Sequence, residues 1–315
     1  MKNKNILLIG SNFARKHHLI QIKKFFDLKN ITICGTKPYR GVIEYFKNYN
    51  LAISSKKYDY ISCATTPKKQ NQILNYLIKN KVRPRGIILE KPILLNQNLI
   101  KFIKYCKKNN VKFYVNFTFA NLTIFQKLSK IIKKRKVVEI KYNLNLEIKK
   151  NKNSWKNKVQ DGGGFVNYYL IHFVYILVCN FNYLKLLRIK KYNKNQFLLT
   201  LKNLKILIYL NINLIKKKDH LIELLMKDNS KIILFNKSNN WFGNFTIYKK
   251  SKKFIKEKLL SKQESIGNAT YMSYKTLFSK NYNINNFYQH TNFLIKTLNI
   301  CNKSNIIIKN DNKKM

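Results

Sequence analysis

The segment NILLIGSNFARKHHL, residues 5–19, decides the fold. It begins as a compact apolar run that ends at Gly10, which is typical of a buried strand, and continues with helical spacing. In doubly wound α/β proteins the pyrophosphate of a dinucleotide lies at such a strand-to-helix turn. Gly10 permits a tight turn, Asn12 stands where a second glycine is usual, and Ala14 is small enough for close helix packing. Taken alone, the motif also fits the strand-to-helix turn of other sheet proteins.

Strand-like and helix-like segments alternate from this start to residue 119. Strands are predicted at 5–10, 31–35, 58–67, 85–92 and 111–119, and helices at 17–26, 41–49, 69–80 and 96–109. Alternation of this kind implies a parallel sheet with helices on both faces. We therefore predict an α/β protein whose residues 1–119 form a Rossmann dinucleotide-binding domain.

Residues 120–315 have a different pattern. A helix is predicted at 121–134 and a half-buried strand at 137–148, and strand-like runs separated by polar turns fill 183–250. A last helix is expected at 286–300, followed by a frayed tail. This pattern predicts a C-terminal α+β domain, residues 120–315, with a large open, mostly antiparallel sheet for substrate binding and oligomerisation.

The net charge of +50 suggests nucleic-acid binding at first sight. However, only six of the 63 basic residues are arginine, whereas DNA-binding proteins favour arginine for bidentate contacts. Lysine, asparagine and isoleucine share A/T-only codons, so an AT-rich bacterial genome explains the composition without nucleic acid as a partner. A DNA-binding protein remains the alternative, and it would bind with steep salt dependence.

The five cysteines are far apart in the chain, which argues against disulfides and against a metal site and fits a reducing cytoplasm. The most apolar segment, 165–181, contains Asn167 and His172 and is shorter than the roughly 20 apolar residues of a membrane span. We expect a cytoplasmic protein without a membrane partner, in which this segment is a buried core helix; a membrane helix is the alternative.

The second predicted strand is followed by GTKPYR, residues 35–40, which contains no acid for the ribose hydroxyls of NAD. Thr36, Lys37 and Arg40 are available instead for a 2′-phosphate. The cofactor prediction is therefore NADP rather than NAD, although these cations also fit the general lysine and arginine background.

Two further strands end in ATTP (64–67) and LEKP (89–92), at the edge that faces the ligand crevice of an open α/β sheet. A lysine there, Lys91, can hold a substrate hydroxyl and lower its pKa. In a chain so rich in lysine the Glu90-Lys91-Pro92 tripeptide is more informative than Lys91 alone, because there are only 13 acidic residues.

The stretch GGGFVNYYLIH, residues 162–172, uses three of the nine glycines directly before an apolar helical segment. His172 follows Gly164 by about two helical turns, so both can line one face. On the residues alone, a core histidine is the alternative for His172. His17 and His18 are expected to be surface or packing residues.

These motifs, in this order, resemble the glucose-fructose oxidoreductase and inositol dehydrogenase (Gfo/Idh/MocA) family. The resemblance rests on IGSNFARKHH, CATTPKKQNQI, ILEKP and the tryptophan followed by DGGGFVNYYLIH, and it covers most of the chain. It implies an NAD(P)-dependent oxidoreductase that transfers hydride between the nicotinamide and a CH–OH or carbonyl group of a sugar-like substrate, in surface polysaccharide synthesis. It also implies a homo-oligomer, dimer or tetramer, joined through the open sheet.

The resemblance assigns roles to individual residues. Lys91 would orient the substrate and His172 would act as general acid or base, both facing one nicotinamide ring, with the glycine segment allowing a close backbone approach. The residues expected to hold the cofactor are Gly10, Ser11, Asn12, Phe13, Ala14, Thr36, Lys37, Arg40, Ala64, Thr65, Thr66, Pro67, Glu90 and Lys91. Those expected to contact the substrate are Asn116, Trp155, Gly163 and Asn167.

The chain departs from the family pattern at several positions. Tyr168 replaces a frequent aspartate four residues before the histidine, and Leu170, Tyr175 and Gln70 replace a glycine, an aspartate and a histidine. Tyr168 becomes a third catalytic candidate, because a phenol can carry a proton once its pKa is lowered from about 10. The departures leave open a second hypothesis, that the protein binds a nucleotide or sugar without catalysis.

Overall fold

The computed structural model describes residues 1–42, 44–94, 96–134, 136–146, 155–158, 161–163, 166–181, 184–193, 196–203, 206–214, 219–236, 245–250, 255–259, 265–283, 285, 288–292 and 294–296. The chain divides into two compact units. Unit 1 comprises Met1–Asn121, Asn153–Tyr175 and Ile266–Asn299, and unit 2 contains Leu122–Lys152 and Ile176–Ser265.

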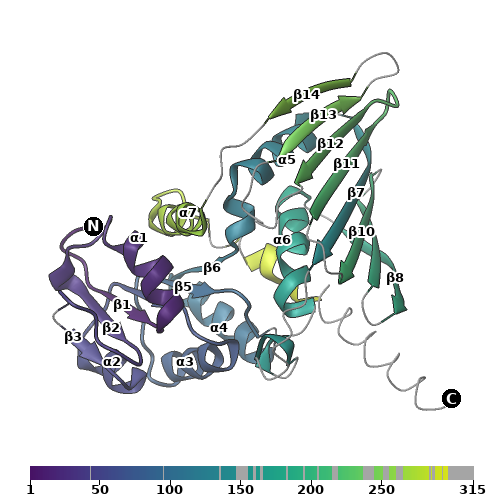
Figure 1. Ribbon diagram of the computed structural model, residues 1–315. Helices are drawn as coiled ribbons and strands as arrows, with labels where there is room; N and C mark the ends of the chain where they lie inside the picture. The colour runs from purple at the N-terminus through teal and green to yellow at the C-terminus, as the bar shows by residue number, and fades with distance from the viewer. Residues whose placement is uncertain are drawn as a thin grey trace, which may run out of the picture. The chain divides into compact units, whose positions relative to one another are not determined.

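Unit 1 is built on a six-stranded parallel sheet with the strand order β3-β2-β1-β4-β5-β6 (Figure 1). Its strands are β1 (Ile6–Ile9), β2 (Ile31–Cys34), β3 (Glu44–Phe46), β4 (Tyr60–Cys63), β5 (Gly86–Glu90) and β6 (Lys112–Asn116). The strand order reverses direction between β1 and β4, where Ile9 pairs with Cys63. Ligands of open α/β sheets bind outside the carboxyl ends of the strands at such a point. The predicted Rossmann architecture is confirmed.

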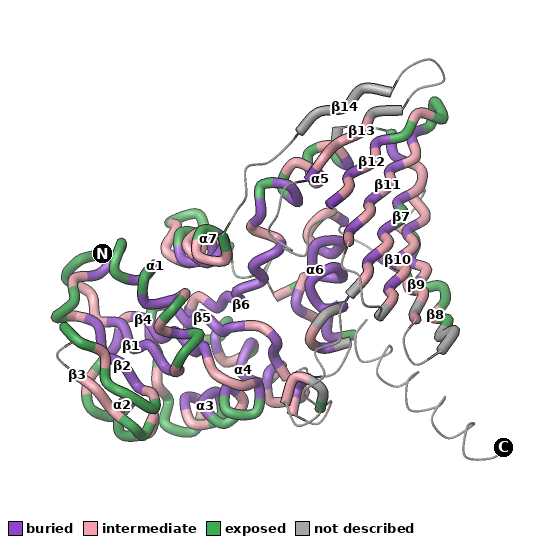
Figure 2. Tube along the Cα trace, in the orientation of Figure 1, coloured by how far each residue is buried: buried purple, intermediate pink, exposed green. Residues whose placement is uncertain are grey.

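Helices cover both faces of this sheet because its central strands are buried along their whole length. All four residues of β1 are buried, and Figure 2 shows the same for the other central strands. Burying each such side chain stabilises the fold by about 1.5–3 kcal/mol. The covering elements are the π-helical turn η1 (Ala14–Leu19), α1 (Ile20–Ile22), α2 (Tyr49–Ser55), α3 (Pro67–Lys79), α4 (Gln97–Lys108) and α7 (Ile266–Phe278). Short 3-10 turns, η2 (Leu28–Asn30) and η3 (Thr118–Asn121), complete the connections.

Two features of unit 1 differ from the sequence expectations. The helix predicted at 41–49 is wrong: Glu44–Phe46 form the edge strand β3, which pairs with β2, and the helix begins only at Tyr49, after Asn48 caps it by accepting from the Asn50 N–H. Sheet pairing outweighs the local pattern here. The second difference is α7, a helix that the sequence did not predict and that packs against α1 and β6.

Unit 2 contains an eight-stranded mixed sheet with the order β14-β13-β12-β11-β7-β10-β9-β8 (Figure 1). The strands are β7 (Val137–Leu146), β8 (Lys185–Asn193), β9 (Gln196–Asn203), β10 (Ile206–Leu214), β11 (Asp219–Met226), β12 (Lys231–Asn236), β13 (Thr246–Lys250) and β14 (Ile255–Leu259). Among the described strands of this sheet, only β7 and β10 pair in parallel. Buried and half-buried residues alternate along β11, as in a sheet with one covered face. The predicted mostly antiparallel sheet is confirmed, and α5 (Thr123–Lys134) also belongs to this unit.

The apolar segment 165–181 is helical from Val166 to Asn180, with a π-helical turn, η6 (Val166–Leu170), leading into α6 (Ile171–Asn180). Within the described part of the chain, no helix combines the length and apolarity needed to cross a bilayer. Residues 288–292 and 294–296 are helical, whereas the rest of the helix predicted at 286–300 and the tail after it lie outside the described residues.

Candidate active site

The turn after β1 touches the end of β4, and Gly10 makes this contact possible. Gly10 has a φ of +147°, and a Cβ there would overlap the carbonyl oxygen of Ala64 and come within 2.8 Å of the Ala14 Cβ. The Gly10 N–H donates to the carbonyl of Cys34 at 2.8 Å, and the Ala64 N–H donates to Ile9 at 2.8 Å. Three neighbouring strands therefore meet at this turn, and only glycine fits.

One cavity opens on the β2 side of this turn and has a volume of about 600 Å³. We call it the β2-side cavity; its lining residues are Ile9, Gly10, Ser11, Cys34, Gly35, Thr36, Lys47, Tyr49, Thr65, Thr66 and Lys69. The Ser11 hydroxyl accepts from the N–H and the hydroxyl of Thr36, at 3.2 and 3.1 Å, which joins the first turn to the end of β2. Burial raises the pKa of the Cys34 thiol to about 11, so it is uncharged at neutral pH.

Among the residues predicted to bind a 2′-phosphate, only Thr36 lines this cavity. Lys37 and Arg40 are exposed and are not among the lining residues. The cavity cations are instead Lys47, directly after β3, and Lys69, in the first turn of α3, whose Nζ lies 4.4 Å from the centre of the Tyr49 ring. Sequence reasoning missed both because nothing distinguishes one lysine from another in so basic a chain.

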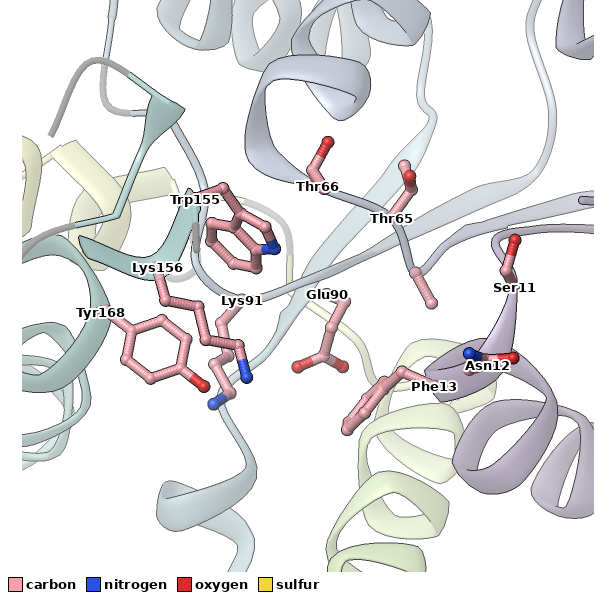
Figure 3. Close-up of a pocket in the computed structure, with 11 residues that line it drawn as sticks. Ser11, Asn12, Phe13, Thr65, Thr66, Glu90, Lys91, Trp155, Lys156 and Tyr168 are labelled. Carbon is pink, nitrogen blue, oxygen red and sulfur yellow. The ribbon is translucent and has the colours of Figure 1, made fainter. Parts of the chain in front are cut away.

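A second cavity, of about 500 Å³, lies on the β5 side of the turn (Figure 3). We call it the β5-side cavity; it is lined by Ser11, Asn12, Phe13, Ala64, Thr65, Thr66, Glu90, Lys91, Trp155, Lys156 and Tyr168. Ser11, Thr65 and Thr66 line both cavities. All of these residues belong to unit 1, so one compact unit holds both cavities at the carboxyl ends of the parallel strands.

One wall of the β5-side cavity is aromatic and cationic. The Nζ atoms of Lys91 and Lys156 lie 5.2 and 5.4 Å from the centre of the Tyr168 ring, within the range of a cation–π interaction. The Trp155 ring meets the Tyr168 ring edge-on, with centroids 5.9 Å apart. Figure 3 shows both ammonium groups and the Tyr168 hydroxyl pointing into the same space. Lys156, in the short 3-10 turn η4 (Trp155–Asn157), was not predicted, because the polar sequence around it carries no motif that marks a lysine.

The floor of the β5-side cavity is the carboxylate of Glu90, the last residue of β5, which is only 5 % exposed. Its Oε2 accepts from His18 Nε2 at 2.9 Å and from Asn116 Nδ2 at 2.7 Å. An imidazole beside a carboxylate must carry its proton on the facing nitrogen, so His18 presents Nε2–H. His18 is thus neither a surface residue nor a simple packing residue.

Helix α7 completes the hydrogen bonding of this floor. The Tyr274 hydroxyl lies 2.8 Å from His18 Nδ1 and 2.7 Å from the Ser62 hydroxyl. The Ser273 hydroxyl donates to Asn116 Oδ1 at 2.6 Å. The five side chains that surround Glu90 in this network are fully buried: His18, Ser62, Asn116, Ser273 and Tyr274. The network therefore holds the carboxylate in one position.

His172 lies close to this site but not among the residues that line it. Its ring is 4 % exposed and stacks on Phe119, with centroids 4.3 Å apart, and its Nδ1 has no hydrogen-bond partner in the described structure. Burial, with the positive charge of Lys91 adding to it, holds the pKa of His172 well below its usual value. The imidazole is therefore neutral at pH 7. Its unprotonated nitrogen can accept a hydrogen bond or a proton.

The glycine segment makes close contacts within unit 1. Gly162 has a φ of +82°, and a Cβ there would come 2.5 Å from the Pro67 Cβ, at the start of α3. Gly163 is buried, and a Cβ there would overlap the carbonyl oxygen of Trp155. The first two glycines therefore press the loop against Pro67 and the Trp155 turn, and Gly164 lies outside the described residues.

The remaining predicted residues have these places. Asn116 is buried in the floor and bonds to Glu90, and Asn167 is buried at 7 % exposure; neither lines the cavity. Pro67 starts α3 at the first helical position, for which proline is suited. Among the described residues no group of three His, Cys, Asp or Glu side chains could hold a metal ion, and the four described cysteines are free thiols.

No protein-family model and no curated protein sequence matches this chain. Solved structures do match it over nearly its whole length. A dehydrogenase (MviM) from Clostridium difficile shares 15 % identity with a TM-score of 0.67, covering 95 % of this chain and 99 % of the other. A dehydrogenase from Chromobacterium violaceum shares 11 % identity with a TM-score of 0.72, covering 100 % of both chains.

A third similar structure is a 3-ketoreductase (KijD10) from Actinomadura kijaniata, solved with NADP and TDP-benzene. It shares 7 % identity with a TM-score of 0.73, and the match covers 93 % of this chain and 96 % of the other. At such low identities these likenesses establish a common two-domain fold.

Proposed function

We propose that this protein is an NAD(P)-dependent oxidoreductase acting on a CH–OH or carbonyl group of a sugar-like substrate. The observation that carries the proposal is the pair of cavities on either side of the Gly10–Ala64 contact, at the point where the strand order reverses. A dinucleotide needs one site for each of its two halves. It also needs a place between them where the protein backbone comes close to the pyrophosphate. The shared fold with dehydrogenases and with an NADP-bound ketoreductase supports the same reading.

The residues present fit such a cofactor. The adenosine half would lie in the β2-side cavity, next to the end of β2, and the nicotinamide half in the β5-side cavity. NADP is favoured over NAD because residues 35–42 contain no acid, while Thr36, Lys47 and Lys69 line the β2-side cavity. When bound, the nicotinamide supplies or accepts the hydride.

The chain's own groups would manage the substrate oxygen. The Lys91 ammonium, held beside Tyr168, would bind the oxygen and stabilise negative charge on it. The Tyr168 hydroxyl would exchange the proton, with the neutral imidazole of His172 as the further acceptor behind the cavity wall. Trp155 would pack against an apolar face of the substrate.

Substrate class, assembly and location follow from the family resemblance. We propose a sugar derivative as substrate, a role in surface polysaccharide synthesis, a cytoplasmic location and a homo-oligomer formed through the sheet of unit 2. One observation favours a non-catalytic binding protein as the second candidate: His172 is buried outside the cavity lining. The family resemblance adds that Tyr168 stands where an aspartate is frequent.

The test is calorimetric titration of the protein with NADPH and with NADH, followed by turnover assays over a panel of sugars and sugar nucleotides. We expect NADPH to bind more tightly, and saturation at 100 times its Kd to stabilise the fold by about 2.7 kcal/mol. Binding without turnover would favour the second candidate. Absence of binding of either dinucleotide would contradict the proposal.

A further inference from the structure

The β5-side cavity contains one more cation than a reaction on a neutral sugar needs. Lys91 and Lys156 both line it, and Glu90 is the only acid among its described lining residues. The Glu90 carboxylate already accepts from His18 and Asn116. In the proposed function Lys91 binds the reacting oxygen, and the positive charge of Lys156 is not used.

The backbone around Lys156 is fixed at the cavity. Lys156 lies in the turn η4 (Trp155–Asn157), where the Lys158 N–H donates to the Trp155 carbonyl at 3.0 Å. The Gly163 N–H donates to the Lys158 carbonyl at 2.9 Å. A Cβ on Gly163 would come within 2.6 Å of the Lys156 carbonyl group. The glycine segment therefore packs directly on the turn that carries Lys156.

The side chain of Lys156 lines the cavity, unlike that of Lys158 two residues later. Lys158 is exposed, whereas Lys156 is half-buried and its Nζ lies 5.4 Å from the centre of the Tyr168 ring. Lysine side chains are mostly exposed in proteins. An ammonium group partly withdrawn from water binds an anion more strongly than an exposed one, because less solvent screens its charge. Lys156 is thus suited to an anionic ligand.

The position of Lys156 indicates where this anion is carried. The pyrophosphate of a dinucleotide would lie at the turn after β1, with Ser11 and Asn12. Figure 3 instead shows the Lys156 ammonium group near the Tyr168 hydroxyl and the end of Lys91, and both ammonium groups lie against the Tyr168 ring. The anion therefore belongs to the substrate, close to its reacting carbon.

The size of the cavity restricts the anion further. A volume of about 500 Å³ has to hold the nicotinamide ring and the sugar ring together. A carboxylate in place of a CH₂OH group adds only one oxygen atom to a sugar, and its single charge matches that of one ammonium group. A nucleoside diphosphate is far larger and would extend beyond the cavity.

We propose that Lys156 binds a carboxylate group of the substrate, which makes the substrate a sugar acid whose carboxylate lies close to the reacting carbon. This inference rests on the proposed function. Lys91 and Lys156 then hold two groups of one sugar, the reacting oxygen and the carboxylate, next to the Tyr168 ring. A phosphate group in the place of the carboxylate is the competing outcome of the test.

Three sugars that differ at one position test this assignment: the methyl glycosides of glucose, glucuronate and glucose 6-phosphate, with the galactose series measured in parallel. Calorimetry gives the Kd of each sugar for the protein saturated with NADPH, in which the reduced cofactor cannot oxidise a hydroxyl group. In at least one series the uronate is expected to bind about 10- to 100-fold more tightly than the neutral sugar, the range of one hydrogen bond between charged groups.

Substitutions separate the charge of Lys156 from its packing. Lys156→Met keeps the length of the side chain, removes the charge and is expected to abolish the preference for the uronate. Lys156→Arg keeps the charge and is expected to retain most of the preference. The matched control is Lys158→Met, the same change two residues away and outside the cavity lining, which is expected to retain the full preference. Thermal melting of each variant reports whether it is folded.

A wild type that binds NADPH but shows no preference for either uronate, or binds no sugar of the panel, overturns this inference and leaves the cofactor site standing. An unchanged preference in folded Lys156→Met does the same. Tighter binding of the 6-phosphate than of the uronate overturns the carboxylate in favour of a phosphate. If Lys156→Met does not fold, Lys156→Gln must show the loss of preference. Failure of the wild type to bind either dinucleotide overturns the proposed function and this inference together.

Discussion

The two cavities of unit 1 share Ser11, Thr65 and Thr66 but hold their polar groups in different ways. In the β5-side cavity, Glu90 is fixed by buried bonds that reach back to α7. In the β2-side cavity, charge comes from Lys47 and Lys69, two exposed side chains.

This difference corresponds to two tasks. A reacting ring must be held within a fraction of an ångström, which needs groups locked by their neighbours. A phosphate anchor needs mainly positive charge, which flexible lysines supply. The β5-side cavity is thus organised for chemistry and the β2-side cavity for attachment. Four predictions follow from this contrast.

The largest expected effect is on stability, from His18→Ala. Removing His18 leaves the buried Glu90 carboxylate without its main partner, and breaking a buried pair in this way costs about 3–5 kcal/mol. The control His17→Ala changes a half-buried neighbour, and Lys69→Ala changes the other cavity; both should shift the unfolding free energy by no more than about 0.5 kcal/mol. Equal losses for His18→Ala and Lys69→Ala in urea unfolding would refute the contrast.

The second effect concerns the junction between the cavities. Gly10→Ala should destabilise by about 2–3 kcal/mol and abolish NADPH binding, because the new Cβ meets the Ala64 carbonyl. Gly41→Ala is the control: its φ of +85° is also left-handed, but nothing lies within 4 Å of the added Cβ. It should cost about 1 kcal/mol, by strain alone. Similar losses in thermal unfolding would show that crowding at Gly10 is unimportant.

The third effect is a pH dependence beside the β5-side cavity. Burial lowers the pKa of His172, and in unit 2 it lowers the pKa of His220 to about 3. Both are neutral when folded and bind protons on unfolding below about pH 6.5, so stability falls as pH falls through that value. For His220 this loss is about 2 kcal/mol between pH 8 and pH 5. His172→Phe should remove one such contribution from the pH dependence of the unfolding free energy, measured by urea unfolding at several pH values. An unchanged pH dependence would contradict the burial of His172 in the folded protein.

The smallest effect is on cofactor affinity in the β2-side cavity. The double substitution of Lys47 and Lys69 by alanine should weaken NADPH binding about 10-fold and leave NADH nearly unchanged, as expected for loss of charged contacts to one phosphate. The control is the double substitution of Lys37 and Arg40, which line neither cavity. If the control pair weakens NADPH more, the 2′-phosphate site is the one predicted from the sequence.

Much of the parallel sheet could be predicted because its strands are short, continuous apolar runs. β1, β4 and β5 lie inside the predicted segments 5–10, 58–67 and 85–92. β3 could not be predicted, since Glu44–Phe46 becomes a strand only through pairing with β2. α7 was missed because its interior face is built from small and polar residues such as Thr270, Ser273 and Tyr274, which bond to the floor rather than forming an apolar stripe.

The candidate site was predictable only where a motif marks it. Gly10, Glu90 and Lys91 lie where their motifs place them, at the ends of β1 and β5. Lys156 and Lys69 carry no local signal, because lysines are spread along the whole sequence of this chain. His18 gains its role from residues 72 and 256 positions away, Glu90 and Tyr274, which no local pattern reveals.

The central claim is that a nicotinamide ring enters the β5-side cavity, and energy transfer from Trp155 to bound NADPH tests it most directly. The chain has two tryptophans, of which Trp155 lines this cavity. We predict that NADPH quenches tryptophan emission and gains sensitised fluorescence, and that Trp155→Phe removes most of this gain while NADPH still binds by calorimetry. Sensitised fluorescence that is undiminished in Trp155→Phe, or absent from the wild type at saturating NADPH, would contradict the account.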